Sequence, residues 1–308
     1  MADMQVQFGR TTLRNPVILA AGTSGVMGEI GDAINLSTLG AITTKSITRK
    51  PRIGNKPTRI AEHPTGMLNA IGLANDGVDT FNSDYGDSAS TLPTTVIGSI
   101  AGHTIEDYVA VAEAMDSNKG ISLIEINVSC PNTADGLEFG ACPVALENLL
   151  SEIKSVLTNT EMIVKLSIAP GNLIPHARAS IEAGAIGLTL INTVPALSID
   201  VQTKKPILTR GIGGYSGKGI HPIAVRVVHE VYRDIAMQEG IPIIGTGGIL
   251  KWQDAAEFIL AGATAVGIGT ASFINPSIAP KVAKKLHHWA SKQGCNSITE
   301  LTGSMITS

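Results

Sequence analysis

The stretch ISLIEINVSCPN, residues 121–132, shows the pattern that the rest of the chain repeats: an apolar run followed at once by polar side chains. The run Ile121–Ile126 predicts a buried strand. The loop after it holds two amides, Asn127 and Asn132, and the thiol of Cys130. Such a loop indicates either a functional site, because amides bind flat polar ligands and a thiol can carry a proton near neutral pH, or a turn with a buried structural cysteine.

Short apolar runs recur along the chain and alternate with longer stretches of helical character. Strands that are apolar throughout are typical of a parallel sheet covered by helices. The sequence therefore predicts an α/β protein, a single-domain (β/α)8 TIM barrel over residues 1–308, with a doubly wound open sheet as the alternative. The eight predicted strands are Val17–Ala20, Gly40–Thr44, Thr95–Ile100, Ile121–Ile126, Met162–Leu166, Gly187–Ile191, Ile241–Gly245 and Ala265–Gly269.

Two long segments interrupt this alternation. Lys45–Leu73, which reads as irregular, follows the second predicted strand, and Asn192–Lys218 follows the sixth. Both are expected to cover the C-terminal mouth of the barrel, where barrel active sites lie, and loops of this length usually carry function. Elsewhere a helix is predicted near Gly28–Ser37, and Thr104 with Asp107 in capping-box spacing predicts the start of another.

The composition excludes several classes of protein. With 44% hydrophobic and 16% charged residues, the 308-residue chain can bury a large core and is not expected to be disordered. A formal net charge of -3, without a long basic run, argues against nucleic-acid binding. Three cysteines without metal-ligand spacing predict neither a zinc site nor a disulfide framework. We see no signal peptide and no apolar stretch of about 18 residues, so we expect a globular protein of a reducing compartment with no membrane span.

Lys165 lies inside an otherwise apolar run, MIVKL at residues 162–166. A buried ammonium without a partner is costly, so this lysine predicts an anionic or strongly accepting partner inside the fold; the alternative is a surface ion pair at the end of a strand. Other polar residues lie near the ends of predicted strands, where a barrel brings them together. They are Lys45, Asn127, Cys130, Asn132, Asn192 and Thr193, with Asn69 in the first long segment.

Glycines cluster after the second long segment and after the last two predicted strands, as GGYSG (213–217), GTGG (245–248) and GIGT (267–270). Glycine lets backbone N–H groups approach a phosphate, and a following helix presents its N-terminus to the anion. Phosphate sites after strands seven and eight recur in barrels, although tight turns also need glycine. The clusters predict a phosphorylated metabolite or a phosphate-bearing cofactor such as FMN.

The other titratable residues point to little further chemistry. The seven histidines show no metal-binding spacing, so no metal site is predicted. Glu125 is the one carboxylate beside the end of the fourth strand, so a hydrolytic pair of carboxylates is not supported. Cys130 is then the titratable group expected in the mouth.

On these motifs the sequence resembles the dihydroorotate dehydrogenases, flavoproteins of pyrimidine synthesis. The strongest match is NVSCPN at 127–132, which is similar to the family's catalytic loop. The other matches span nearly the whole chain in the expected order. They are GMLNAIGL (66–73), VKLS (164–167), LINT (190–193), GGYSG (213–217), IIGTGG (243–248) and VGIGT (266–270).

The resemblance implies a (β/α)8 barrel that holds one FMN over its mouth and oxidises dihydroorotate to orotate. Cys130, rather than a serine, looks like the base of class 1 members, which would take the proton from C5 while hydride passes from C6 to flavin N5. Lys165 would stabilise the anionic reduced flavin at its N1/C2 edge. The residues implied to bind substrate are Lys45, Asn69, Ala70, Ile71, Gly72, Leu73, Asn127, Asn132, Asn192 and Thr193.

The same resemblance implies a cofactor site. Two of its positions depart from the family pattern: Ala21 stands where a serine is common, and Ser99 where members of the 1B branch often have asparagine. The residues implied to hold FMN are Ala21, Gly22, Lys45, Ser46, Ser99, Asn127, Lys165, Ile191, Gly217, Gly247, Gly248, Gly269 and Thr270.

Within class 1, the segment GLEFG (136–140), with Gly54 and Pro57–Glu62, is similar to the 1B branch. Members of that branch pair with an iron–sulfur and FAD subunit that passes electrons to NAD, and this chain has no cysteine cluster for a 2Fe-2S centre of its own. The resemblance implies a cytoplasmic homodimer, or a heterotetramer with that subunit. Two alternatives stay open: a 1A-type homodimer that uses fumarate, and a non-flavin, phosphate-binding barrel lyase or isomerase.

Overall fold

The barrel predicted from the apolar runs is present. The computed structural model describes residues 1–129, 139–168 and 171–306. Eight parallel strands close into a barrel, in which β16 pairs back to β3 and the open doubly wound sheet is excluded. Around the barrel the strands are β3 (Val17–Leu19), β4 (Ala41–Thr43), β7 (Thr95–Ile100), β8 (Ile121–Asn127), β9 (Glu161–Leu166), β10 (Gly187–Leu190), β15 (Ile243–Thr246) and β16 (Ala265–Ile268).

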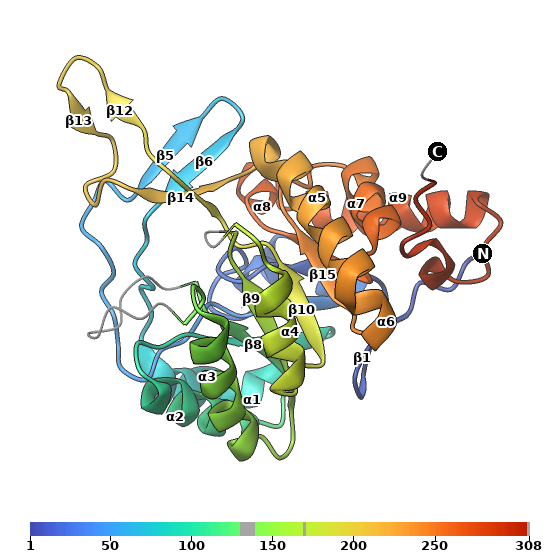
Figure 1. The fold of residues 1–308 in the computed structure, drawn as a ribbon, viewed down its shortest axis with the longest axis horizontal. Helices are drawn as coiled ribbons and strands as arrows, with labels where there is room; N and C mark the ends of the chain where they lie inside the picture. The colour runs from blue at the N-terminus through green and yellow to red at the C-terminus, as the bar shows by residue number, and fades with distance from the viewer. Residues whose placement is uncertain (130–138, 169–170, 307–308) are drawn as a thin grey trace.

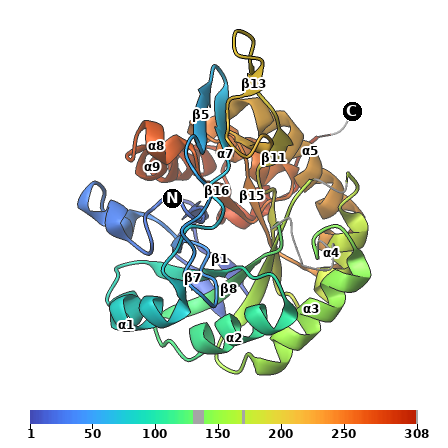
Figure 2. The same cartoon turned by 90° about the vertical axis from the view of Figure 1, so that its left-hand side faces the viewer.

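Helices cover the outside of the barrel, as Figures 1 and 2 show. They are α1 (Gly77–Ala89), α2 (Ile105–Asp116), α3 (Pro143–Val156), α4 (Ile174–Glu182), α5 (His221–Val231), α6 (Met237–Glu239), α7 (Trp252–Ala261), α8 (Ala271–Ile274) and α9 (Ile278–Lys292). The 3-10 turns η3 (Lys218–Ile220) and η5 (Ile298–Leu301) and the π-helical segment η4 (Tyr232–Ala236) lie among them. The predicted start of α2 is confirmed, because Thr104 Oγ1 accepts a hydrogen bond from the Asp107 N–H at 3.2 Å. Among the described residues, none of the helices could cross a membrane on grounds of length and hydropathy.

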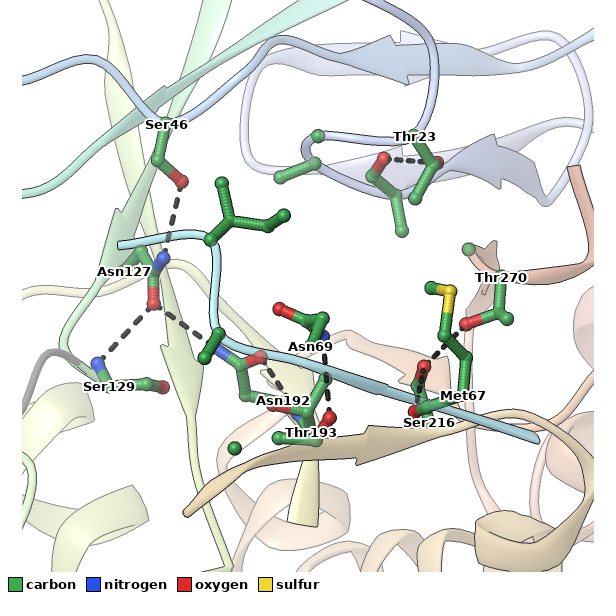
Figure 3. A pocket seen from close by; sticks show the side chains of 18 of the residues that line it. Thr23, Ser46, Met67, Asn69, Asn127, Ser129, Asn192, Thr193, Ser216 and Thr270 are labelled. Carbon is green, nitrogen blue, oxygen red and sulfur yellow. Dashed lines mark hydrogen bonds between the residues drawn. The ribbon is translucent and has the colours of Figure 1, made fainter. Parts of the chain in front are cut away.

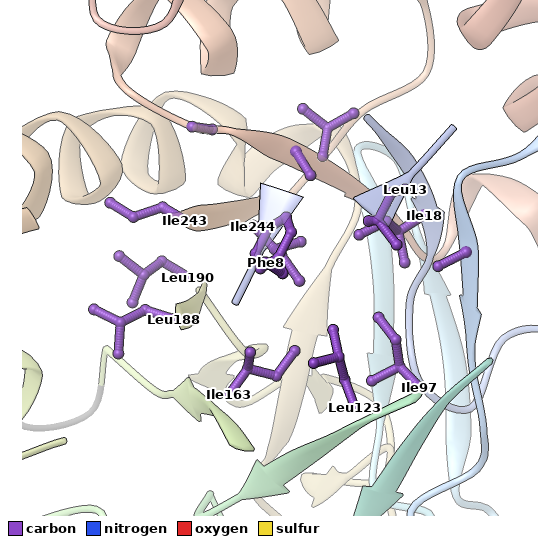
Figure 4. Close-up of a cluster of buried hydrophobic side chains, with 14 of the residues drawn as sticks. Phe8, Leu13, Ile18, Ile97, Leu123, Ile163, Leu188, Leu190, Ile243 and Ile244 are labelled. Atoms are coloured by element: carbon purple, nitrogen blue, oxygen red, sulfur yellow. The ribbon is translucent and has the colours of Figure 1, made fainter. Parts of the chain in front are cut away.

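Aliphatic side chains fill the barrel (Figure 4). Leu123 and Ile163 are fully buried, and each shares its strand face with the residue two positions on, Glu125 or Lys165. The amino end of the barrel is covered by a hairpin of β1 (Val6–Phe8) and β2 (Thr11–Leu13). Phe8 is fully buried against Gly187, where an added Cβ would lie 3.2 Å from the ring. The interior of the barrel is therefore apolar from the hairpin up to Glu125 and Lys165, the polar residues near the carboxyl ends of the strands.

The helix predicted near Gly28–Ser37 is not formed. Two 3-10 turns take its place, η1 (Glu29–Asp32) and η2 (Leu36–Thr38). Between them, the side chain of Asn35 accepts a hydrogen bond from the Ser37 N–H at 3.0 Å. Such a local bond competes with helical hydrogen bonding, which explains why the predicted helix is divided.

A small antiparallel sheet lies over the mouth, so the first long segment is not irregular as predicted. This segment forms the hairpin of β5 (Ile60–His63) and β6 (Gly66–Asn69), and β6 pairs with β14 (Gly213–Ser216) of the second segment. The sheet, completed by β11 (Val194–Ala196), projects beyond the barrel together with the pair β12 (Ile199–Asp200) and β13 (Lys205–Pro206) (Figure 1). These strands are short and partly exposed, so they lack the apolar runs that predicted the barrel strands.

Asp116, the last residue of α2, ties that helix to the segment before β9. Its carboxylate oxygens accept hydrogen bonds from backbone N–H and hydroxyl groups of Thr158 and Thr160, and from the Asn159 N–H, at 2.7–3.1 Å. Burial alone would raise the pKa of Asp116, but these hydrogen bonds favour the charged carboxylate and hold the pKa well below its usual range.

Replacing Asp116 with asparagine is expected to lower the free energy of unfolding by about 2–3 kcal/mol near pH 7, because several donors lose a charged acceptor. The folded-state pKa lies below the unfolded one, so this stabilisation is full above the unfolded value, near about 4, and is lost as the pH falls through the folded value. Urea unfolding at about pH 7 and about pH 3 measures this, and the gap between wild type and variant should narrow in acid. Equal unfolding midpoints near neutral pH would contradict the role.

Candidate active site

A cavity of about 680 Å³ lies at the carboxyl ends of the barrel strands, beside the small antiparallel sheet. This volume is typical of small-molecule and cofactor sites. Cys130 and Asn132 lie outside the described residues, but Ser129, the last residue described before them, lines the cavity. So do the other assigned residues except Ser99: Ala21, Gly22, Lys45, Ser46, Asn69, Ala70, Ile71, Gly72, Leu73, Asn127, Lys165, Ile191, Asn192, Thr193, Gly217, Gly247, Gly248, Gly269 and Thr270.

Asn127 joins three segments at one wall of this cavity (Figure 3). Its Nδ2 donates to Ser46 Oγ at 3.2 Å, and its Oδ1 accepts from Asn192 Nδ2 at 3.1 Å. The Ser129 N–H donates to the same Oδ1 at 3.3 Å. Because the amide donates on one side and accepts on the other, its orientation is fixed. The amides of Asn127 and Asn192 are thus held in place on the cavity wall before any ligand binds.

Ser99 does not line the cavity, although it was assigned to the cofactor site. It is fully buried, and its Oγ lies 2.9 Å from Ser46 Oγ. Its N–H donates to Thr44 Oγ1 at 2.8 Å. Ser99 therefore supports Ser46 from behind the wall, and any influence on a ligand would pass through that neighbour.

Lys165 reaches the cavity wall from inside the barrel. Its side chain is 8% exposed, and Nζ lies 3.7 Å from Oε1 of Glu125 on β8. The other Glu125 oxygen accepts a hydrogen bond from Thr189 Oγ1 on β10 at 2.9 Å. The anionic partner that a buried ammonium requires is therefore present, which excludes a surface ion pair. Since 3.7 Å exceeds a hydrogen-bond length and Nζ donates to no described residue, its donors are available to a ligand.

Lys45 supplies a second ammonium to the cavity. It lies beside Gly22, where an added Cβ would be 3.5 Å from Nζ. Burial, and then the positive charge of Arg59, lower the pKa of Lys45. A bound anion would oppose both effects, because it favours the charged ammonium. The cavity thus suits a ligand with negative charge near Lys45.

Glycines from three segments form one end of the cavity. Gly217 and Gly248 have φ of 105° and 65°, which favour glycine, and a Cβ added at Gly248 would lie 2.7 Å from Gly217 O. Gly269 also lines the cavity, and a Cβ added there would be in ordinary van der Waals contact with Ala20 Cβ at 3.7 Å. Nearby on the lining, Thr246 Oγ1 is buried with no partner among the described residues. Glycine backbone on the cavity lining, beside a hydroxyl without a partner among the described residues, fits a phosphate group such as that of FMN.

Three basic side chains that also line the cavity, Arg52, His103 and Arg210, were not assigned from the sequence. Arg52 Nη1 contacts His103 Nε2, and Arg52 Nε donates to Gly72 O at 3.4 Å. Arg52 and Arg210 lie in the two long segments, and the expected position of those segments over the mouth was the only signal that could have found them. They add to the positive charge that the two lysines bring to the site.

A further cluster that the sequence did not predict lies next to the glycine end. His221, Asp254 and Glu257 bring ligand atoms within 4.8 Å of one another. Asp254 Oδ1, however, accepts a hydrogen bond from Lys218 Nζ at 2.7 Å. His221 Nδ1 lies 2.8 Å from Gly247 O, within hydrogen-bond distance. The His221 contact thus holds the Gly247 carbonyl, and the Lys218–Asp254 pair ties the residue after Gly217 to α7.

The fold and the site together define a (β/α)8 barrel enzyme whose cavity lies at the carboxyl ends of the strands. Comparison with known proteins then identifies the family. The model of the family described as Dihydroorotate dehydrogenase matches residues 3–289. The chain belongs to the dihydroorotate dehydrogenase family.

Individual relatives agree with this result. "Dihydroorotate dehydrogenase B (NAD(+)), catalytic subunit" of Bacteroides thetaiotaomicron is 40% identical over 306 residues, 99% of either chain. Proteins of that name from Geotalea uraniireducens and Desulforudis audaxviator are 41% and 42% identical, and the matches cover 99% and 97% of this chain and 99% and 96% of theirs. The crystal structure of DHODH from Eimeria tenella in complex with ferulenol has a TM-score of 0.81 at 21% identity, over 98% of this chain and 88% of that one, which shows the shared fold. The predicted resemblance to the 1B branch is confirmed.

Proposed function

We propose that this chain is the catalytic subunit of an NAD-linked dihydroorotate dehydrogenase, which oxidises dihydroorotate to orotate in pyrimidine biosynthesis with one FMN per chain. The observation that carries the proposal is a single cavity that has the amides of Asn127 and Asn192 on one wall and glycine backbone suited to a phosphate at one end. Amides match the alternating donors and acceptors of a pyrimidine, and the backbone N–H groups of glycine segments can bind a phosphate. The shared name of the relatives supports the NAD branch.

The two ends of the cavity would divide the binding work. Asn127 and Asn192 would hydrogen-bond the pyrimidine, together with Asn69 and Thr193, and Lys45 would offset the negative charge of the ligands. When bound, FMN supplies the acceptor for the hydride that leaves C6 of dihydroorotate. The residues that would hold its phosphate end are Gly217, Gly247, Gly248, Gly269 and Thr270.

Two residues would take part in bond breaking. Cys130 would accept the C5 proton as the C5–H and C6–H bonds break and the C5–C6 double bond forms. A thiol suits this task because its pKa lies near the working pH. Lys165 would keep a fixed positive charge at the wall, where it stabilises negative charge that develops in the cavity without reorganisation.

The proposal extends to assembly and location. Three cysteines are too few for the four that a 2Fe-2S cluster takes, so iron–sulfur and FAD groups would come with a partner subunit, in a heterotetramer built on a homodimer of this chain. Residues 1–308 would form a single FMN-binding domain. The described cysteines, Cys142 and Cys295, are free, and a catalytic thiol must stay reduced, so we place the enzyme in the cytoplasm.

Anaerobic mixing of the purified, FMN-loaded chain with dihydroorotate tests the proposal. We expect the visible absorbance of oxidised flavin to fall and orotate to form mole for mole with flavin. A chain that binds no FMN would instead favour a non-flavin lyase or isomerase. Rapid reoxidation of the isolated chain by fumarate would favour the 1A-type enzyme and contradict the NAD-linked branch.

A further inference from the structure

Glu125 is a buried charge that the proposed reaction does not use. We propose that Glu125 is a positioning residue, whose carboxylate holds the Lys165 ammonium at the cavity wall while the hydrogen-bond donors of that ammonium stay free for the flavin. This inference rests on the proposed function, because it gives Lys165 a ligand to meet. It adds to that function a residue that determines where the Lys165 ammonium lies on the cavity wall.

Glu125 lies one layer below the cavity. On β8 it precedes Asn127 by two residues, so both point into the barrel. Asn127 is the register partner of Lys165 on β9, which places Glu125 beneath the lysine. The carboxylate side chain is 3% exposed, and Glu125 does not belong to the described lining of the cavity. It can therefore act on a ligand only through Lys165.

The carboxylate is held so that one oxygen faces the ammonium. Thr189, the register partner of Lys165 on β10, donates its hydroxyl proton to Glu125 Oε2 at 2.9 Å. Oε1 has no hydrogen-bond partner among the described residues and lies 3.7 Å from Lys165 Nζ. Three neighbouring strands thus fix the pair, and the unshared charge of Oε1 is directed at Lys165.

The separation of the pair has a chemical consequence. A direct hydrogen bond at about 2.8 Å would occupy one of the three donors of the ammonium. At 3.7 Å the attraction is still strong in a buried setting, yet no donor is committed. Without the carboxylate, the long flexible side chain of a lysine in an apolar interior would turn toward water. Glu125 therefore keeps the Lys165 ammonium at the cavity wall with its donors available to a ligand.

The near-isosteric variant Glu125→Gln tests this, because it removes the charge and keeps an acceptor for Thr189. We expect the rate of flavin reduction by saturating dihydroorotate to fall about 10- to 100-fold, a loss of the size seen when a residue that orients a metal ligand is removed. The dihydroorotate concentration for half-maximal rate should change little. In FMN-free protein, titration with FMN followed by flavin fluorescence should show weaker binding by Glu125→Gln.

A double-mutant cycle that combines Glu125→Gln with Lys165→Met shows whether Glu125 acts through the lysine or only supports the structure of the barrel. If Glu125 acts through Lys165, adding Glu125→Gln to Lys165→Met should change the flavin reduction rate and the FMN affinity by less than about threefold. Asp116→Asn is the matched control, because it alters another buried carboxylate, one that lies outside the cavity. It should lower stability and leave the reduction rate unchanged.

A wild-type reduction rate in Glu125→Gln, or an equal loss in both lysine backgrounds, would overturn the inference. If dihydroorotate fails to reduce even the wild-type flavin, the proposed function is wrong. The FMN affinities of the single and double variants then still show whether Glu125 acts through Lys165. If Glu125→Gln does not fold, the double variant is decisive. A folded double variant supports the pair, because it leaves no buried charge unpartnered; a double variant that also fails to fold makes Glu125 structural and overturns the proposal.

Discussion

Replacing Cys130 with alanine is expected to lower the rate of flavin reduction by dihydroorotate by about two to four decades, the range for loss of a general base. The thiol is the group that would accept the C5 proton, whereas the residues proposed to hold FMN are unchanged. FMN should therefore stay bound with its usual visible spectrum. Anaerobic stopped-flow measurement of the flavin absorbance gives the rate directly.

Two further sets of variants make this result specific. Cys130→Ser should keep some activity only at high pH, because a hydroxyl is far harder to deprotonate than a thiol. Cys142→Ala and Cys295→Ala remove the two described free thiols and should reduce flavin at the wild-type rate. A fully active Cys130→Ala protein would remove the cysteine from the mechanism.

Replacing Lys165 with methionine should have the second large effect. Methionine keeps most of the side-chain volume but removes the charge, so flavin reduction should slow by about 10²- to 10³-fold, as on loss of one preorganised electrostatic group. Glu125 would then be buried with no counter-charge, which is expected to lower the free energy of unfolding by about 3–5 kcal/mol. Stopped-flow reduction and urea unfolding measure the two losses separately.

The matched control is Lys285→Met on α9, where the same exchange is made at an exposed lysine. It should change neither the reduction rate nor, beyond about 0.5 kcal/mol, the stability. An unchanged reduction rate in Lys165→Met would contradict the electrostatic role. If Lys165→Met loses stability but reduces flavin at the wild-type rate, the role of Lys165 is structural, within the barrel core.

The barrel could be predicted because its signals are local. Each of the eight strands is a short apolar run, and a run such as Ile121–Ile126 shows its character whatever its neighbours are. Glycine clusters and strand-end amides are local signals too, which explains why most of the assigned residues converge on one cavity. The carboxyl ends of parallel strands necessarily meet at the same end of a barrel.

Features that depend on register or on long-range pairing could not be predicted in this way. The sequence indicated that Lys165 needs a partner, but only the alignment of β8, β9 and β10 shows that Glu125 is that partner. The hairpin of β5 and β6 is stabilised by pairing with β14, about 150 residues away in sequence, and not by its own apolar pattern. Likewise the family resemblance assigns Ser99 to the cofactor site, although Ser46 lies between Ser99 and the cavity.

The central claim is that one cavity at the mouth of the barrel holds the flavin and the pyrimidine together. A crystal structure of the FMN-loaded chain with orotate tests it most directly. We predict FMN with its phosphate on the backbone of Gly248 and Gly269, and orotate hydrogen-bonded to Asn127 and Asn192, with Lys165 facing the flavin. Either ligand bound outside this cavity, or Lys165 turned away from the flavin, would contradict the account.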